Sequence, residues 1–159
     1  MQFSSRIDIA ASAEFVFASL TDFDGWEALA RAKGAQIIRQ DPAGRMQAGE
    51  GSCWEGSFIF KGKTRNGTLM LRESRASERL VIQADGRGIG GDLLVEITPI
   101  GAGRSRLSVQ GELRPKSLAA RLFVQSLRLA KGRVQAKLNK RVADYGRRLE
   151  GKYAMRGVS

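Results

Sequence analysis

The sequence of 159 residues contains no histidine and only one cysteine. Histidine is the commonest general base and the commonest metal ligand, so its absence removes the usual centre of acid–base or metal chemistry. Cys53 alone cannot form an intrachain disulfide, which favours a reducing, cytoplasmic setting. Without a histidine to activate its thiol, we interpret Cys53 as an inert small residue rather than a nucleophile. The sequence therefore predicts no metal, no cofactor and no identifiable catalytic centre.

Long apolar runs are also missing. No stretch approaches the length of a membrane-spanning helix, and the N-terminus lacks the basic and apolar regions of a signal peptide. The apolar share of 42% and the charged share of 27% are those of a globular protein. We expect one domain over residues 1–152 and a flexible tail at 153–159.

Acidic residues are scarce at one end of the chain, where the net charge of +11 is concentrated. Residues 1–115 hold 15 Lys and Arg against 14 Asp and Glu, whereas residues 116–152 hold 11 against 2. The basicity is therefore a property of the C-terminal segment.

The same segment, Lys116 to Lys152, contains no proline and starts just after Pro115. Its apolar residues recur every three or four positions, which predicts one long helix. A helix of roughly 35 residues would be about 50 Å long. Leu118, Leu122 and Leu129 add a second apolar row, so we expect the part before Gly132 to be buried more fully than the part after it.

The first 34 residues predict a strand and two short helices. Phe3–Ile9 alternates apolar and polar residues as a half-buried strand does. Ser12 is placed as the N-cap of a first helix, Thr21 followed by Asp24 signals a second, and Gly34 ends it.

From residue 35 onward the apolar period changes to two. This predicts six strands joined by short turns: 35–40, 51–60, 63–73, 79–85, 92–98 and 105–113. We place one hairpin turn at Gly62 in preference to Asn66-Gly67 because it leaves better balanced strands. One face of each strand is apolar and the other polar, so the sheet packs on one side only. The predicted fold class is α+β, a seven-stranded antiparallel sheet covered by a long C-terminal helix.

This order of elements, with IDIAASAEFVFASLTDFDGWEAL at Ile7–Leu29, resembles the SRPBCC superfamily of START-like, helix-grip proteins, which includes polyketide cyclases. Gly51-x-x-Trp54, Arg79-Leu80 and the amphipathic terminal helix add to the resemblance. It implies a curved sheet wrapped around the helix with a cavity between them. It also implies a lipophilic ligand such as a lipid, quinone or polyketide and, in some members, cyclisation of that ligand.

Gly86 to Gly91 reads G-R-G-I-G-G and formally fits the dinucleotide motif G-x-G-x-x-G. That motif needs a helix next, but DLLVEITP alternates as a strand does. We interpret the stretch as a hairpin loop.

The resemblance and the aromatic content select the candidate ligand-binding residues, since pockets are mostly apolar with aromatic walls. Arg72 faces the pocket only if Thr68 and Met70 do; the opposite parity places Leu69 and Leu71 inside and Arg72 in water. The candidates are Trp26, Trp54, Phe58, Phe60, Met70, Arg72, Ile82, Val95, Leu118 and Leu122.

Three functions remain open at this point. The first is binding of a lipophilic molecule without chemistry. The second is a polyketide cyclase or dehydrase in which Arg72, or an acid between Asp22 and Glu27, acts on a bound carbonyl. The third is docking of the basic helix on an anionic membrane; RNA is disfavoured because no aromatics suitable for base stacking accompany the cations. The basic residues concerned are Arg133, Lys137, Lys140, Arg141, Arg147 and Arg148.

Overall fold

The computed structural model describes residues 1–42, 48–60 and 62–156, and the side chain of Phe60 lies outside this described part. The chain forms seven strands and four helices there. In order they are β1 (Gln2–Ile9), α1 (Ala13–Leu20), α2 (Phe23–Ala32), β2 (Gln36–Gln40), β3 (Cys53–Phe60), β4 (Lys63–Arg75), β5 (Arg79–Gly86), β6 (Ile89–Gly101), β7 (Arg104–Pro115), α3 (Leu118–Leu129) and α4 (Lys131–Met155).

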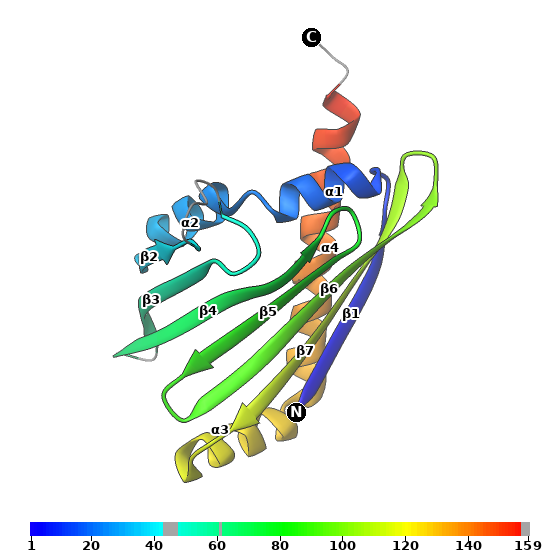
Figure 1. Cartoon of the computed structure of the whole chain (residues 1–159). Coiled ribbons are helices and arrows are strands. Elements are labelled where there is room, and N and C mark those ends of the chain that lie inside the picture. Colours follow the sequence, from blue (N-terminus) through cyan, green and yellow to red (C-terminus); the bar gives the residue numbers. More distant parts are fainter. Residues whose placement is uncertain (43–47, 61, 157–159) are drawn as a thin grey trace.

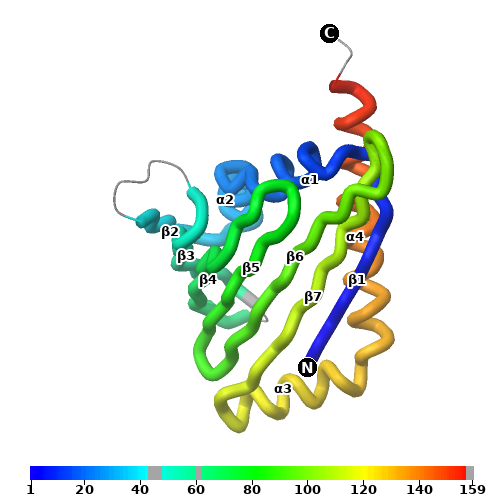
Figure 2. The backbone as a smooth tube through the Cα atoms, turned by 45° about the vertical axis from the view of Figure 1, so that its right-hand side comes forward, coloured from blue at the N-terminus to red at the C-terminus, as the bar shows by residue number. Residues whose placement is uncertain are grey.

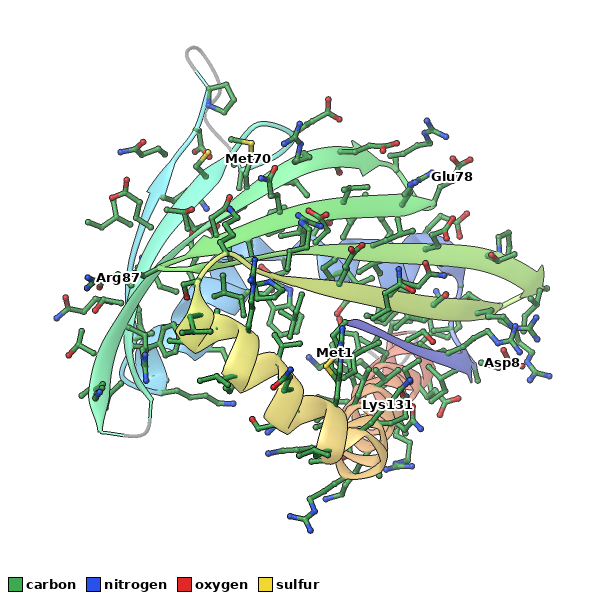
Figure 3. All side chains as sticks on the ribbon, turned by 90° about the horizontal axis from the view of Figure 1, so that it is seen from below. Met1, Asp8, Met70, Glu78, Arg87 and Lys131 are labelled. Atoms are coloured by element: carbon green, nitrogen blue, oxygen red, sulfur yellow. The ribbon has the colours of Figure 1, made fainter. Side chains whose placement is uncertain are left out.

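The strands form one antiparallel sheet in the order β1-β7-β6-β5-β4-β3-β2. Figure 1 shows α4 running alongside β1, with α1 and α2 across one end of the sheet and α3 at the other, and Figure 3 shows the sheet bent around the side that holds these helices. We call the face toward α1 and α4 the inner face, and the opposite one the outer face. This arrangement confirms the predicted fold class.

The hairpin predictions are also confirmed. Phe60 pairs with Lys63, which places the turn at Gly62, where φ is +74°. Asn66 and Gly67 lie in the middle of β4. The sequence from Gly86 to Gly91 forms the end of β5, a turn and the start of β6, so no helix follows it.

Hydrogen bonds at the helix starts explain where the helices begin. Ser12 Oγ accepts a hydrogen bond from the amide of Phe15, as expected of an N-cap. The second helix is capped one residue later than predicted, because the carboxylate of Asp22 accepts from the amide of Gly25 while Thr21 still caps the end of α1.

The core lies between the inner face, α1 and α4. Val16 of α1 and Leu149 of α4 are buried against it. The strand side chains that are sealed in this core are Ile9, Leu71, Leu80, Val95, Ile97 and Leu107. Gly146 allows α4 to approach β1, since a Cβ there would lie 3.1 Å from Ile7 Cδ1. The long helix therefore packs mainly on the β1 edge of the sheet.

The predicted single C-terminal helix is wrong, because it is broken at Ala130. Ala130 has φ −103° and ψ 21°, which ends α3 and starts α4 in a new direction. Figure 2 shows α3 running across the end of the sheet and α4 running up beside β1. Helix α4 extends to Met155, beyond the expected start of a tail at residue 153. The ring of Tyr153 packs edge-on against that of Phe15, with 5.2 Å between the ring centroids. Residues 157–159 lie outside the described part.

Candidate functional site

The inner face of the sheet is sealed at one end and exposed at the other. Along β4, Leu71 is fully buried, yet Leu69 on the same face is 46% exposed. Along β3, Ser52, just before the strand, is fully buried, whereas Phe58 is 47% exposed. Exposed apolar side chains on the concave side of a curved sheet are available to a ligand. We call the set Trp54, Phe58, Leu69, Ile82 and Leu93 the inner apolar surface. Within it, Trp54, Ile82 and Leu93 are half-buried.

Register explains why these side chains lie together. Trp54 pairs with Leu69, Leu69 pairs with Ala84, and Ile82 pairs with Leu93. Directly opposed residues of neighbouring antiparallel strands project from the same face. The four strands β3 to β6 therefore place these apolar side chains on one face, where Phe58 lies opposite Arg65.

A row of glycines crosses this surface between Trp54 and Phe58. Gly56 pairs with Gly67, and Gly67 pairs with Gly86, so three neighbouring strands project no side chain there. A Cβ added at Gly56 would meet only backbone oxygens, at 3.8 and 4.0 Å. The space next to Phe58 and Leu69 is therefore left open by the sequence.

Trp54, beside this row, is held in place by a buried carboxylate. Its Nε1 donates to Glu27 Oε1 at 2.8 Å, and its ring lies 5.2 Å from that of Phe23. Glu27 is 8% exposed and also receives a hydrogen bond from Arg39 Nη1 at 3.2 Å. Since these two hydrogen bonds join α2 to the sheet, the Glu27 carboxylate holds α2 over the edge formed by β2 and β3.

Arg39 completes the same cluster. It donates to Asp24 at 2.9 Å and lies 3.3 Å from Asp41, in addition to contacting Glu27. The hydrogen bond to Asp24 and the nearby carboxylates raise the pKa of Arg39 above its usual value. The cluster is charged, but its members are engaged with one another.

A second polar contact lies between α1, α2 and α4. The hydroxyl of Tyr145 shares a hydrogen bond of 2.9 Å with Ser19 Oγ, and burial raises the pKa of this phenol. Trp26 stacks on Tyr145 at 5.7 Å and donates through Nε1 to the carbonyl of Leu20. With 40% of its surface exposed, Trp26 lies on α2 above the closed end of the sheet.

The structure places the other predicted ligand-binding residues in several different parts of the molecule. Trp54, Phe58 and Ile82 lie on the inner apolar surface, and Val95 lies on the same face inside the sealed core. Leu118 and Leu122 are exposed on α3. The side chain of Phe60 lies outside the described part.

The remaining two are Met70 and Arg72, and the orientation that places them inside is wrong. Leu69 and Leu71 take the inner positions because burying Leu71 in the core is favourable, whereas burying an unpaired guanidinium is not. Figure 3 shows Met70 pointing away from the helices. Arg72 bonds to Gln83 on the outer face.

The outer face carries two hollows. One, of about 520 Å³, is lined by Arg72, Arg79, Val81, Gln83, Asp92, Leu94 and Arg114. The other, of about 500 Å³, lies over β2 to β5 and is lined mostly by polar side chains and glycines. In the first, the hydrogen bond from Arg114 lowers the pKa of Asp92. Within this hollow Asp92 is paired with Arg114, Arg79 lies near Glu73, and Arg72 is bonded to the neutral side chain of Gln83.

The six basic residues proposed for an anionic surface are all exposed on α4. They lie opposite Val142, Gly146 and Leu149, the buried side of the helix. Arg147 is paired with Asp144. The structure thus presents these cations to solvent.

Several residues of the site were not singled out from the sequence. The glycine row and Leu93 could have been found by aligning the predicted strands in register. Only the pairing of Gly67 with Gly86 also needs the β-bulge between Leu71 and Glu73, which no pattern marks. No sequence pattern marked Arg39 as part of the site, because its partners lie on α2 and at Asp41, after β2, and meet it only in the folded structure.

Two further properties concern the described residues only. No group of three or more Asp, Glu, Cys or His side chains there could hold a metal ion. No helix in the same part of the chain is long and apolar enough to cross a membrane.

Solved structures with this fold include enzymes and a START protein. An aromatase/cyclase (Zhui) from Streptomyces sp. R1128 has a TM-score of 0.64 and 14% identity, covering 100% of this chain and 96% of its own. A START superfamily protein from Mycobacterium smegmatis has a TM-score of 0.53 and 17% identity, covering 87% and 97%. Norcoclaurine synthase from Thalictrum flavum has a TM-score of 0.57 and 13% identity, covering 90% and 92%. At these identities the similarity shows the fold alone.

No curated protein sequence matches the chain. Residues 1–149 do match a family profile that covers nearly every element described above. The chain belongs to the family described as polyketide cyclase / dehydrase and lipid transport.

Proposed function

We propose that the protein binds a lipophilic small molecule on the inner apolar surface, for transport or sequestration. The observation that carries this proposal is the exposure of Phe58 and Leu69 on the same face as the sealed core. A folded protein rarely leaves adjoining apolar side chains open on its concave side unless something covers them. The family description, which includes lipid transport, supports the same class of ligand.

The surface offers a defined shape to such a ligand. Trp54 cannot rotate freely because Glu27 holds its indole nitrogen, and the glycine row leaves room beside it. A rigid aromatic wall next to open space favours a flat or elongated apolar molecule, since little conformational entropy is lost on binding.

Binding without chemistry is favoured over cyclase activity. Glu27 and Arg39 are the ionisable groups nearest to Trp54 in the cluster, and they are bonded to each other. Arg72, the other catalytic candidate, lies on the outer face. A cyclase would need an acid or base free to act on the ligand. Turnover of a polyketide substrate that is lost in Glu27→Gln would favour the enzyme instead.

Native mass spectrometry of the purified protein tests this proposal. We expect a bound lipophilic molecule that is retained by wild type and by Ile38→Asp, since Ile38 is exposed on the outer face of β2. Leu69→Asp should lose it, because a carboxylate would then stand in the middle of the inner apolar surface. Equal retention by the two variants would contradict the proposed location.

We also propose that the basic arc of α4 contacts anionic surfaces. All six cations are exposed, and each can gain about 1 kcal/mol near an acidic leaflet. Charge reversal at Lys137, Lys140 and Arg141 should weaken binding to acidic vesicles without changing ligand retention. Unchanged vesicle binding would rule out this role. The cytoplasmic setting stays a prediction from the single cysteine.

A further inference from the structure

Helix α3 exposes a row of leucines. Leu118 is 74% exposed, Leu122 60% and Leu129 93%. At 100° per residue these three positions fall on one side of the helix. The opposite side, with Val124 only 2% exposed, carries the packing on the rest of the protein. The exposed row is far more apolar than a solvated helix surface needs to be.

The charge around this row has one sign. Between Lys116 and Ala143 the sequence contains eight basic residues and no acidic one. Arg121 and Arg128 directly precede Leu122 and Leu129 on α3, and all four side chains are exposed. Figure 3, which views the molecule from below, shows α3 across this end with Lys131 beside it at the start of α4.

Most of these cations form no ion pair in the part of the chain that the structure describes. In this region the ion pairs join Lys116 to Asp85 and Arg147 to Asp144. Across the described part of the chain, no ion pair involves Arg121, Arg128 or Lys131. Free cations beside an exposed apolar row are the composition of a helix that lies in a membrane interface.

We propose that α3 docks on an anionic bilayer, with Leu118, Leu122 and Leu129 inserted at the boundary of headgroups and acyl chains. Arg121 and Arg128 then pair with lipid phosphates or carboxylates on the same side of the helix. Neither half suffices alone, since stable association of a peripheral protein takes apolar burial together with charge attraction.

Two other occupants fit the surface less well. A nucleic acid would pair with the cations but would leave the leucines exposed, and the row has no aromatic ring for base stacking. A second copy of the chain would cover the leucines but would bring like charges together, which is repulsive. A bilayer satisfies both features at once.

The attachment of α3 makes docking directional. The amide of Lys116 donates to the carbonyl of Gly88 at 2.6 Å, and Lys116 Nζ lies 3.2 Å from Asp85, so the start of the helix is tied to the turn between β5 and β6. Ser117 caps the helix through the amide of Ala120. Docking would therefore hold this end of the sheet at the membrane. The proposal does not depend on ligand binding at the inner apolar surface.

Flotation with lipid vesicles tests the proposal. Wild type should bind phosphatidylcholine vesicles containing phosphatidylserine at low salt, and should bind pure phosphatidylcholine much more weakly. Arg121→Gln with Arg128→Gln should lower the affinity by roughly 30-fold, the effect of two interfacial cations. Leu122→Ser with Leu129→Ser should lower it by about tenfold or more.

Matched controls separate insertion from other effects. Ile38→Ser with Ile59→Ser removes two exposed apolar side chains from the outer face and should leave vesicle binding unchanged. Charge reversal on the α4 arc should lower the bound fraction without altering how α3 inserts. All replaced side chains are exposed, so the thermal unfolding midpoints should match wild type.

A tryptophan at the row reports insertion directly. In Leu122→Trp, acidic vesicles should shift the added emission to the blue, and brominated acyl chains should quench it, relative to the Trp26 and Trp54 signal of wild type. The proposal is overturned if wild type does not bind acidic vesicles, or if the leucine double variant binds as wild type does. Binding of RNA without acyl-chain quenching would assign the surface to nucleic acid. A dimer that disappears with the leucines would assign it to a second copy.

Discussion

Replacing Glu27 should cost far more stability than replacing a neighbouring acid. Glu27→Ala leaves the Trp54 indole N–H without its partner and removes one carboxylate from Arg39. An unpaired buried donor costs about 1–3 kcal/mol, and breaking a buried ion pair costs about 3–5 kcal/mol. Arg39 keeps Asp24 and Asp41, so the total should lie near the lower end. We expect a loss of about 3 kcal/mol in the free energy of unfolding.

Urea unfolding followed by far-ultraviolet circular dichroism measures this loss. Glu27→Gln keeps an oxygen for the indole and should cost about 1 kcal/mol. Asp24→Ala is the matched control, since that carboxylate contacts the same arginine but its side chain is 84% exposed; it should cost less than about 1 kcal/mol. Equal losses for Glu27→Ala and Asp24→Ala would refute the view that the buried contacts hold α2 on the sheet.

Three further predictions concern the core, the glycine row and the outer face. Leu71→Ala should lower the free energy of unfolding by about 2–5 kcal/mol, because the fully buried leucine leaves a cavity; urea unfolding measures it. Gly56→Val should fold normally but lose retention of the bound molecule in native mass spectrometry, because its side chain fills the space beside Phe58. Since the Arg114 hydrogen bond depresses the pKa of Asp92, this pair adds stability above the ordinary aspartate value of about 4, and that stability is lost as pH falls through the lower folded pKa. Asp92→Asn should therefore flatten the acid side of the unfolding profile. A Leu71→Ala loss below about 1 kcal/mol, an unchanged ligand in Gly56→Val or an unchanged acid slope in Asp92→Asn would each contradict the corresponding argument.

The fold was predictable because its signals are local and repeated. Strand alternation, the glycine turn at Gly62 and the cap at Ser12 each fix a piece of chain without reference to the rest. Antiparallel pairing then follows from the short turns. The capping of α2 differed by one residue, because Thr21 and Asp22 are both good caps and only the tertiary structure selects between them.

The faces of two elements could not be predicted in the same way. The C-terminal segment has two apolar rows, and periodicity does not say which one meets the sheet. The structure buries Val124 and exposes Leu122, the reverse of the expectation for that row. In β4, alternation allowed either parity, and the bulge after Leu71 changes the parity along the strand. Both outcomes depend on long-range packing.

Two consecutive residues of β3 allow the most direct test of ligand binding at the inner apolar surface. Phe58 and Ile59 point to opposite faces, with 47% and 77% of their surfaces exposed. Burying the exposed half of a phenylalanine, about 100 Å², contributes up to about 2 kcal/mol, or roughly 30-fold in affinity. The measurement is the binding of the neutral fluorescent probe N-phenyl-1-naphthylamine to wild type, Phe58→Glu and Ile59→Glu. The account predicts that Phe58→Glu binds the probe at least about 30-fold more weakly than wild type and that Ile59→Glu binds it with wild-type affinity. Equal affinities in the two variants would contradict it.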